Sequence, residues 1–101
     1  MRLIKNKQLM DLAARHPRCR PAVLAWKRLM LVNTFTDFVS LRRVFPHADQ
    51  VTVASRRTVT IFNLSRSFRL ITAIHYKQGR VYILRLFTHS EYDKNQWKDD
   101  L

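Results

Sequence analysis

The chain has 101 residues, 47% of them apolar, which predicts one domain over residues 1–101 with one hydrophobic core. It has 19 Lys and Arg but only 7 Asp and Glu, which gives a net charge of +12. Like charges repel one another in a compact fold, and a bound polyanion would relieve this repulsion. Nucleic acid is the usual partner of this kind, and an acidic protein or an anionic membrane surface is the alternative. A single cysteine excludes an internal disulfide, and without a signal peptide or an apolar run near ~20 residues we expect a cytoplasmic protein with no membrane partner.

Two helices are expected in the first third of the chain, after a short strand at residues 1–4. Asn6 is suited to cap the first helix, which should end at His16 because the residue before a proline avoids helical geometry. Pro21 suits the first turn of the second helix. Apolar residues at helical spacing predict its buried stripe: Ala22, Ala25, Trp26, Leu29 and Met30. A connection of about four residues predicts that the two helices pack antiparallel.

The rest of the chain changes to a strand pattern. After a short helical turn near residues 40–43, β-branched and aromatic residues predict strands near residues 51–53, 59–61, 68–76 and 81–87. Helices followed by an antiparallel meander indicate an α+β fold with two N-terminal helices packed on one face of a small, mainly antiparallel sheet. Trp97 is expected to cover an edge of that sheet.

The last hairpin contains the only glycine of the chain, Gly79. A three-residue loop at residues 77–79 with a left-handed Gly79 would place Ile71 opposite Arg85 and Arg69 opposite Phe87. A two-residue loop would turn Arg85 into the core at a cost of several kcal/mol, about the penalty of an unpaired buried charge. We therefore expect the three-residue loop.

This register assigns the hairpin residues to two faces. The apolar face should pack on the helices, with Phe68, Leu70, Thr72, Ile74, Tyr82, Leu84 and Leu86. The opposite face should combine basic and apolar groups: Arg69, Ile71, Ala73, His75, Ile83, Arg85, Phe87 and His89. His75 is expected to be structural or a surface residue of the pairing strand.

Residues 50–90 contain no Asp or Glu, although seven Lys and Arg fall in this stretch: Arg56, Arg57, Arg66, Arg69, Lys77, Arg80 and Arg85. Their positive charge is locally unpaired, which favours a polyanion-binding surface. The alternative is that Asp11, Asp37 and Asp49 pair with them in the fold. Arg56 and Arg57 are expected in a hairpin turn, where contact with an RNA backbone is a secondary role.

The segment Thr88–Lys94 concentrates reactive side chains where the last strand ends. A histidine such as His89 can serve as general acid or base, and a helical turn would bring Tyr92 to the same side. Arginine binds phosphate through two parallel bonds, so Arg69 and Arg85 suit a phosphate ligand. The alternatives are that His89 is an ordinary strand-end residue and that Arg69 pairs with Asp93 to fix the C-terminus.

RNA carries its own nucleophile, the 2′-OH group. Cleavage through it needs a base, an acid and positive charge at the phosphate, and it needs no metal. No carboxylate cluster suggests a Mg²⁺ site, so we expect neither a metal nor another cofactor. Metal-independent RNA cleavage therefore suits these residues.

Several of these segments together resemble the HigB toxins, a family of the RelE-like superfamily of type II toxin–antitoxin modules. The resemblance rests on residues 58–64, 68–71 and 81–83 and on the ending Thr88-His89-x-x-Tyr92-Asp93-Lys94, and it covers nearly the whole chain. It implies a RelE-like toxin fold and a ribosome-dependent mRNA endonuclease. It also implies a helix-turn-helix antitoxin, HigA, that neutralises the toxin and alone contacts operator DNA.

The resemblance also implies roles for single residues. Arg69 would contact the scissile phosphate, and His89 and Tyr92 would hold the basic and aromatic positions. With Asp93 to orient His89, the expected catalytic set is Arg69, His89, Tyr92 and Asp93. The expected contacts to RNA and ribosome are Asn63, Arg85, Arg56, Arg57, Arg66, Lys77, Lys27 and Arg28.

Two departures from the family pattern concern the site. The turn at residues 64–67 is shorter and has no glycine, and Phe87 stands where glycine is common. Two other functions remain open: a non-catalytic RNA- or DNA-binding module, and a gyrase-inhibiting toxin like ParE. The first would bind RNA without cleaving it, and the second would leave mRNA intact and damage DNA.

Overall fold

A computed structural model describes residues 1–101, and its one sheet has five strands in the order β1-β5-β4-β3-β2. The strands are β1 (Arg2–Ile4), β2 (Asp49–Thr52), β3 (Thr58–Leu64), β4 (Phe68–His75) and β5 (Arg80–Thr88). The helices are α1 (Asn6–Arg15), α2 (Arg20–Val32), α3 (Phe38–Val44), α4 (His89–Asp93) and α5 (Trp97–Asp100), with a 3₁₀ turn at Pro17–Cys19. β2 to β5 form the expected antiparallel meander, and β1 pairs parallel to β5.

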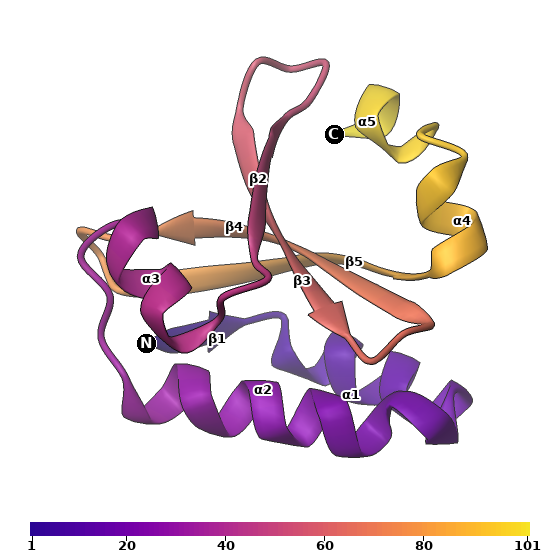
Figure 1. Ribbon diagram of the computed structural model, residues 1–101, viewed down its shortest axis with the longest axis horizontal. Coiled ribbons are helices and arrows are strands. Elements are labelled where there is room, and N and C mark those ends of the chain that lie inside the picture. The colour runs from indigo at the N-terminus through magenta and orange to yellow at the C-terminus, as the bar shows by residue number, and fades with distance from the viewer.

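The sheet separates two hydrophobic clusters of unequal size. On one face, α1, α2 and α3 cover a cluster of 16 buried residues that includes Leu9, Trp26 and Leu41 (Figure 1). On the other face, a cluster of seven buried residues is completed by Trp97 from the C-terminal segment. The predicted α+β arrangement, with the N-terminal helices on one face, is confirmed. Trp97 was wrongly expected at a sheet edge, because it packs on the second face. No helix is both long and apolar enough to span a bilayer.

Two details of the first helices differ from the sequence prediction. Asn6 is the first residue of α1 and not its cap; Lys5 holds the cap position in a left-handed conformation, with no side-chain bond to the helix. The buried residues of α2 are Val23, Trp26 and Met30, whereas Ala25 and Leu29 are exposed. Trp26 and Met30 of the predicted stripe are therefore confirmed, whereas Ala25 and Leu29 were predicted wrongly. Nearly every position of α2 is apolar, so the periodicity does not fix which face is buried.

The register of the β4–β5 hairpin agrees with the prediction only away from the turn. Arg69 pairs with Phe87 and Ile71 with Arg85, as expected, and Gly79 has the expected left-handed backbone with φ 65°. Next to the turn, however, His75 pairs with Arg80, so the loop has one more residue than expected. A register shift between Ile71 and Thr72 restores the expected pairing.

This shift changes which β5 residues face the helices. Ile83 lies in the helix-side cluster, and Tyr82 and Leu84 lie in the cluster of the second face, the reverse of the prediction for all three. A bulge gives one strand an extra residue, so alternation breaks there. Leu84 and the exposed Arg85 are therefore consecutive in the chain, yet neither side chain enters the helix-side core.

The positive charge of the chain is not neutralised by the fold. The structure's one ion pair within 4 Å joins His89 and Asp93, so no Lys or Arg is paired with a carboxylate. The alternative that Asp11, Asp37 and Asp49 pair with the arginines of residues 50–90 is therefore wrong at ion-pair distance.

Candidate active site

The candidate site lies where β3, β4, β5 and α4 meet. Asn63, Arg69 and Phe87 are neighbours in register on the three adjacent strands. Phe68 pairs with Thr88. Arg69 is the residue after Phe68, and His89 is the residue after Thr88. Strand pairing thus brings Arg69 of β4 close to His89, the first residue of α4 after β5.

A capping box starts α4 and fixes the segment that carries His89. The backbone N–H of Glu91 donates to Thr88 Oγ1 at 3.2 Å, and the Thr88 N–H donates to Glu91 Oε1 at 3.0 Å. The backbone N–H of His89 also donates to the Ser67 carbonyl at 2.7 Å, which ties α4 to the β3–β4 turn. The Thr-x-x-Glu spacing is a known helix-start signal. Thr88 and Glu91 are the residues that the sequence prediction missed, although this signal would have found them.

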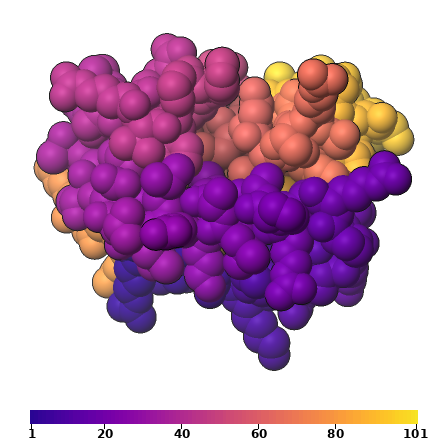
Figure 2. Space-filling model, turned by 60° about the horizontal axis from the view of Figure 1, so that its bottom comes forward, coloured from indigo at the N-terminus to yellow at the C-terminus, as the bar shows by residue number.

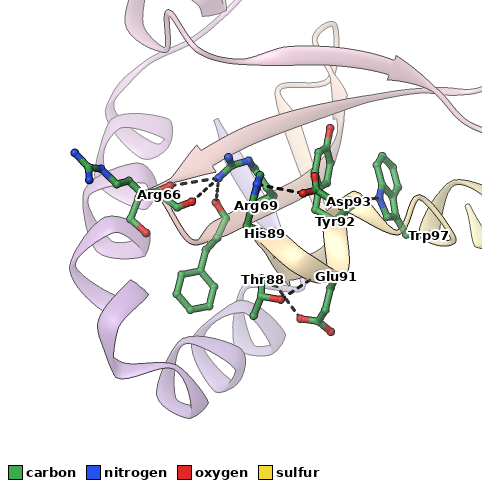
Figure 3. Close-up of polar contacts among 10 residues, drawn as sticks. Arg66, Arg69, Thr88, His89, Glu91, Tyr92, Asp93 and Trp97 are labelled. Carbon is green, nitrogen blue, oxygen red and sulfur yellow. Dashed lines mark hydrogen bonds and ion pairs between the residues drawn. The ribbon is translucent and has the colours of Figure 1, made fainter.

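His89 and Asp93 form a contact across one turn of α4. His89 Nε2 lies 3.2 Å from Asp93 Oδ2, and the two side chains are 54% and 60% exposed. Figure 3 shows this pair beside Arg69 and Tyr92. An exposed pair of this kind contributes at most about 1 kcal/mol, so its main effect is on how the imidazole is oriented.

The Arg69 guanidinium is half-buried and has no carboxylate partner. Its Nη1 donates to the backbone carbonyls of Phe68 at 3.0 Å, Ser65 at 3.4 Å and Arg66 at 3.5 Å (Figure 3). The alternative that Arg69 pairs with Asp93 is wrong, because Asp93 contacts His89 instead. Carbonyl contacts position the guanidinium without neutralising it, and its charge stays available to an anion.

Tyr92 is held by the tryptophan of α5. The two rings stack at 5.3 Å between centroids and 22° between planes, and Trp97 Nε1 donates to the Tyr92 carbonyl at 3.0 Å. Burial raises the pKa of the Tyr92 phenol, the Asp49 and Asp93 charges raise it further, and only the nearby Arg69 opposes them. The phenol is therefore protonated at neutral pH and can donate a proton or a hydrogen bond.

The structure separates the other expected RNA contacts into groups. Asn63 and Arg66 lie near Arg69, in the neighbouring strand and in the β3–β4 turn. Lys27 and Arg28 lie on α2, which covers the opposite face of the sheet and comes forward in purple in Figure 2. Lys77 lies in the turn at the far end of the hairpin. Three others lie at or beside a groove on the second face: Arg56, Arg57 and Arg85.

The side chains of the site give no obvious metal centre. No group of three or more His, Cys, Asp or Glu lies close enough together to hold a metal ion. The site's chemistry is that of an unpaired guanidinium, an imidazole with a carboxylate beside it and a protonated phenol.

The chain is similar to a family of known bacterial toxins. Residues 19–95 match the HigB toxin family, described as the RelE-like toxic component of a toxin-antitoxin system. The chain therefore belongs to the HigB toxin family, which confirms the resemblance seen in the sequence, and an antitoxin is its class of partner. Curated relatives include the mRNA interferase toxin HigB of Escherichia coli K12 and the mRNA interferase HigB of Escherichia coli O157:H7 and of Shigella flexneri. Each is 29% identical over 94 residues, covering 92% of this chain and 88% of the relative.

Proposed function

We propose that this chain, acting as one domain over residues 1–101, is an mRNA interferase that cuts messages bound to the ribosome. The observation that carries the proposal is the convergence of Arg69, His89 and Tyr92 at one end of the sheet, with Arg69 free of any carboxylate. The names of the curated relatives support the same reaction class.

The proposed reaction uses the 2′-OH of the RNA. The 2′ oxygen attacks the adjacent phosphorus, its proton passes to a protein base, and the bond from phosphorus to the 5′ oxygen breaks. The leaving 5′ oxygen takes a proton from a protein acid, which gives a 2′,3′-cyclic phosphate and a free 5′-OH. Arg69 would stabilise the extra negative charge on the phosphate oxygens in the transition state. This route requires no metal ion.

The environments of the two proton-bearing groups suggest how they divide this work. Tyr92 keeps its proton at neutral pH, so it can donate but not accept. His89 is then the candidate base, and Asp93 orients its ring from the next turn of α4. Tyr92 can in addition stack on a base of the message.

The remaining cations would contact RNA without taking part in the reaction. Asn63 and Arg66 would hold the message beside Arg69, and Lys27 and Arg28 on the opposite face would contact ribosomal RNA. Binding should weaken steeply with salt because phosphate contacts release counterions. We further propose a cytoplasmic protein whose antitoxin is of the HigA helix-turn-helix type and alone contacts operator DNA.

The test is cleavage of a defined mRNA by the purified chain, with and without ribosomes, together with toxicity in cells. Arg69→Ala and His89→Ala should each lower cleavage by at least about 100-fold, the usual value of an electrostatic or acid–base contribution. Arg43→Ala is the charge-matched control, because Arg43 is exposed on α3. Full cleavage by both site variants would refute the site.

Two further results would separate the proposal from its rivals. A 2′-O-methyl group at the cut position should block cleavage, and the products should carry 2′,3′-cyclic phosphate and 5′-OH ends. RNA binding without any product would favour a non-catalytic module. Intact mRNA together with DNA damage would favour gyrase inhibition.

A further inference from the structure

A second basic groove lies on the same sheet face as the candidate site, toward the other end of β4. It has a volume of about 390 Å³, and its walls include Lys5, Arg57, Arg85, His75 and Tyr82. Ala73 and His75 lie four and six positions beyond Arg69, which is about 13–20 Å at ~3.3 Å per residue. Arg85 lies at the opposite end of the groove, because it pairs with Ile71, two positions from Arg69. The groove therefore begins beside the candidate active site and extends away from it along β4.

Three cations reach this groove from segments far apart in the sequence. Lys5 follows β1, whose Ile4 pairs with Tyr82; Arg57 precedes β3; and Arg85 lies in β5. No Asp or Glu lines the groove, and none of the three cations is in an ion pair. No ion pair within 4 Å therefore neutralises these three positive charges.

Backbone irregularities help to place each of these cations. Lys5 has a left-handed φ of 65°, and so does Arg56, next to Arg57, with φ 69°. Arg85 lies at the register shift in the β4–β5 ladder. Left-handed non-glycine residues and bulges cost stability, and they often occur where a side chain is aimed at a functional site. These features determine the backbone from which the three cations reach the groove.

The groove also offers aromatic surface. His75 and Tyr82 are in T-shaped contact, with ring centroids 5.0 Å apart and planes at 66°. Tyr82 is only partly buried and His75 is exposed, so a planar group can reach both rings. Cations together with exposed rings are the combination that binds single-stranded nucleic acid, where phosphates meet the charges and bases meet the rings.

We propose that this groove binds a second segment of the single-stranded RNA that is cut at the Arg69 end. Lys5, Arg57 and Arg85 would contact its phosphates, and a base would lie against His75 and Tyr82. The proposal rests on the proposed function, since it assigns the groove to the same substrate. Holding one strand at two places raises its effective concentration at the site, so the groove should matter more for long RNA than for short.

The test measures binding of 2′-O-methyl RNA, which cannot be cleaved through its 2′ oxygen. Fluorescence anisotropy is recorded for oligonucleotides of about four and about twelve nucleotides, within the usual range of single-strand site sizes. The groove variant combines Lys5→Gln, Arg57→Gln and Arg85→Gln. The matched control combines Lys7→Gln, Arg2→Gln and Arg43→Gln, which removes the same charge from exposed positions outside the groove.

The groove variant should bind the long oligonucleotide at least about tenfold more weakly than the control, with little difference for the short one. Its plot of log K against log salt should be less steep by about 2, since each lost phosphate contact contributes about 0.7 for single strands. Tyr82→Leu should weaken long-RNA binding by about tenfold, within the range for a stacked base, and leave the salt slope unchanged.

Equal weakening in the groove variant and the control would overturn the proposal, as would tighter binding of a duplex of the same sequence. Because the assay reads binding alone, its failure is distinguishable from failure of the proposed function. If the wild type cleaves RNA but the groove variant binds long RNA as the control does, the groove proposal is wrong. If the groove variant binds long RNA more weakly but the wild type does not cleave RNA, the proposed endonuclease function is wrong.

Discussion

The two faces of the sheet differ in how many apolar residues they bury and in what covers them. The helix-side face buries 16 residues under α1, α2 and α3, whereas the second face buries seven and is covered by the C-terminal segment, from which Tyr92, Trp97 and Leu101 pack against it. The candidate active site and the basic groove both lie on the second face. Most of the apolar burial is therefore concentrated on one face, which leaves the other free to expose cations.

The largest effect should come from removing the residue that closes the second face. Trp97 is 3% exposed and contacts Phe87 and Tyr92. Trp97→Ala should lower the free energy of unfolding by about 3–5 kcal/mol, the range for deleting a large buried aromatic side chain. Urea unfolding followed by circular dichroism measures this change.

The matched control for Trp97→Ala is Trp26→Ala in the helix-side cluster. Both should destabilise by similar amounts, but only Trp97→Ala should also lower kcat at temperatures where each variant is folded, since Tyr92 loses its stacking partner. Equal kcat values for the two folded variants would show that Trp97 supports the fold alone and not the candidate site.

The fold was predictable from the sequence because its signals are local. The left-handed Gly79 and the long β-branched runs predicted the hairpin itself. The pairing of Arg69 with Phe87 was also predicted correctly, but from a loop one residue too short, and the register shift near Leu84 compensated for the difference. The extra loop residue and this shift were not predictable, because a bulge depends on the packing of both faces at once.

The candidate site was predicted in part. The proximity of Arg69 and His89 follows from register, and the contact of His89 with Asp93 follows from helical spacing. The sequence could not place Trp97 over the second face, because that requires the chain after α4 to fold back on the sheet. The sequence also could not predict that Lys5 and Arg85 line the same groove, because this depends on the parallel pairing of β1 with β5.

A smaller effect is expected from the cap of α4, which holds the site at the end of the second face. Thr88→Ala removes the acceptor of the Glu91 N–H and should cost about 1 kcal/mol of stability, a typical value for an N-cap. Thr88→Ser keeps the hydroxyl and should retain most of it. Thermal unfolding of the three proteins is the measurement, and identical midpoints for the alanine and serine variants would contradict a capping role.

Asp93→Asn should have a still smaller effect, which tests its role in positioning His89. Because the pair is more than half exposed, kcat should fall no more than about fivefold, the equivalent of about 1 kcal/mol, with KM unchanged. Asp93→Glu should recover part of the loss. A fall as large as that of His89→Ala would mean that Asp93 itself contacts the reacting groups.

The smallest expected effect is the pH dependence of the α4 cap. The hydrogen bond from the Thr88 backbone lowers the pKa of Glu91 below its ordinary value, which is about 4.3. A carboxylate with a lowered folded pKa stabilises the fold fully above its unfolded pKa, and this contribution is lost as pH falls through the folded value. The stability difference between the wild type and Glu91→Gln should therefore be constant above about pH 5 and shrink below it. Urea midpoints of both proteins across this range measure the difference, and one that stays constant down to the lowest pH at which both fold would show that the α4 carboxylate does not contribute through its charge.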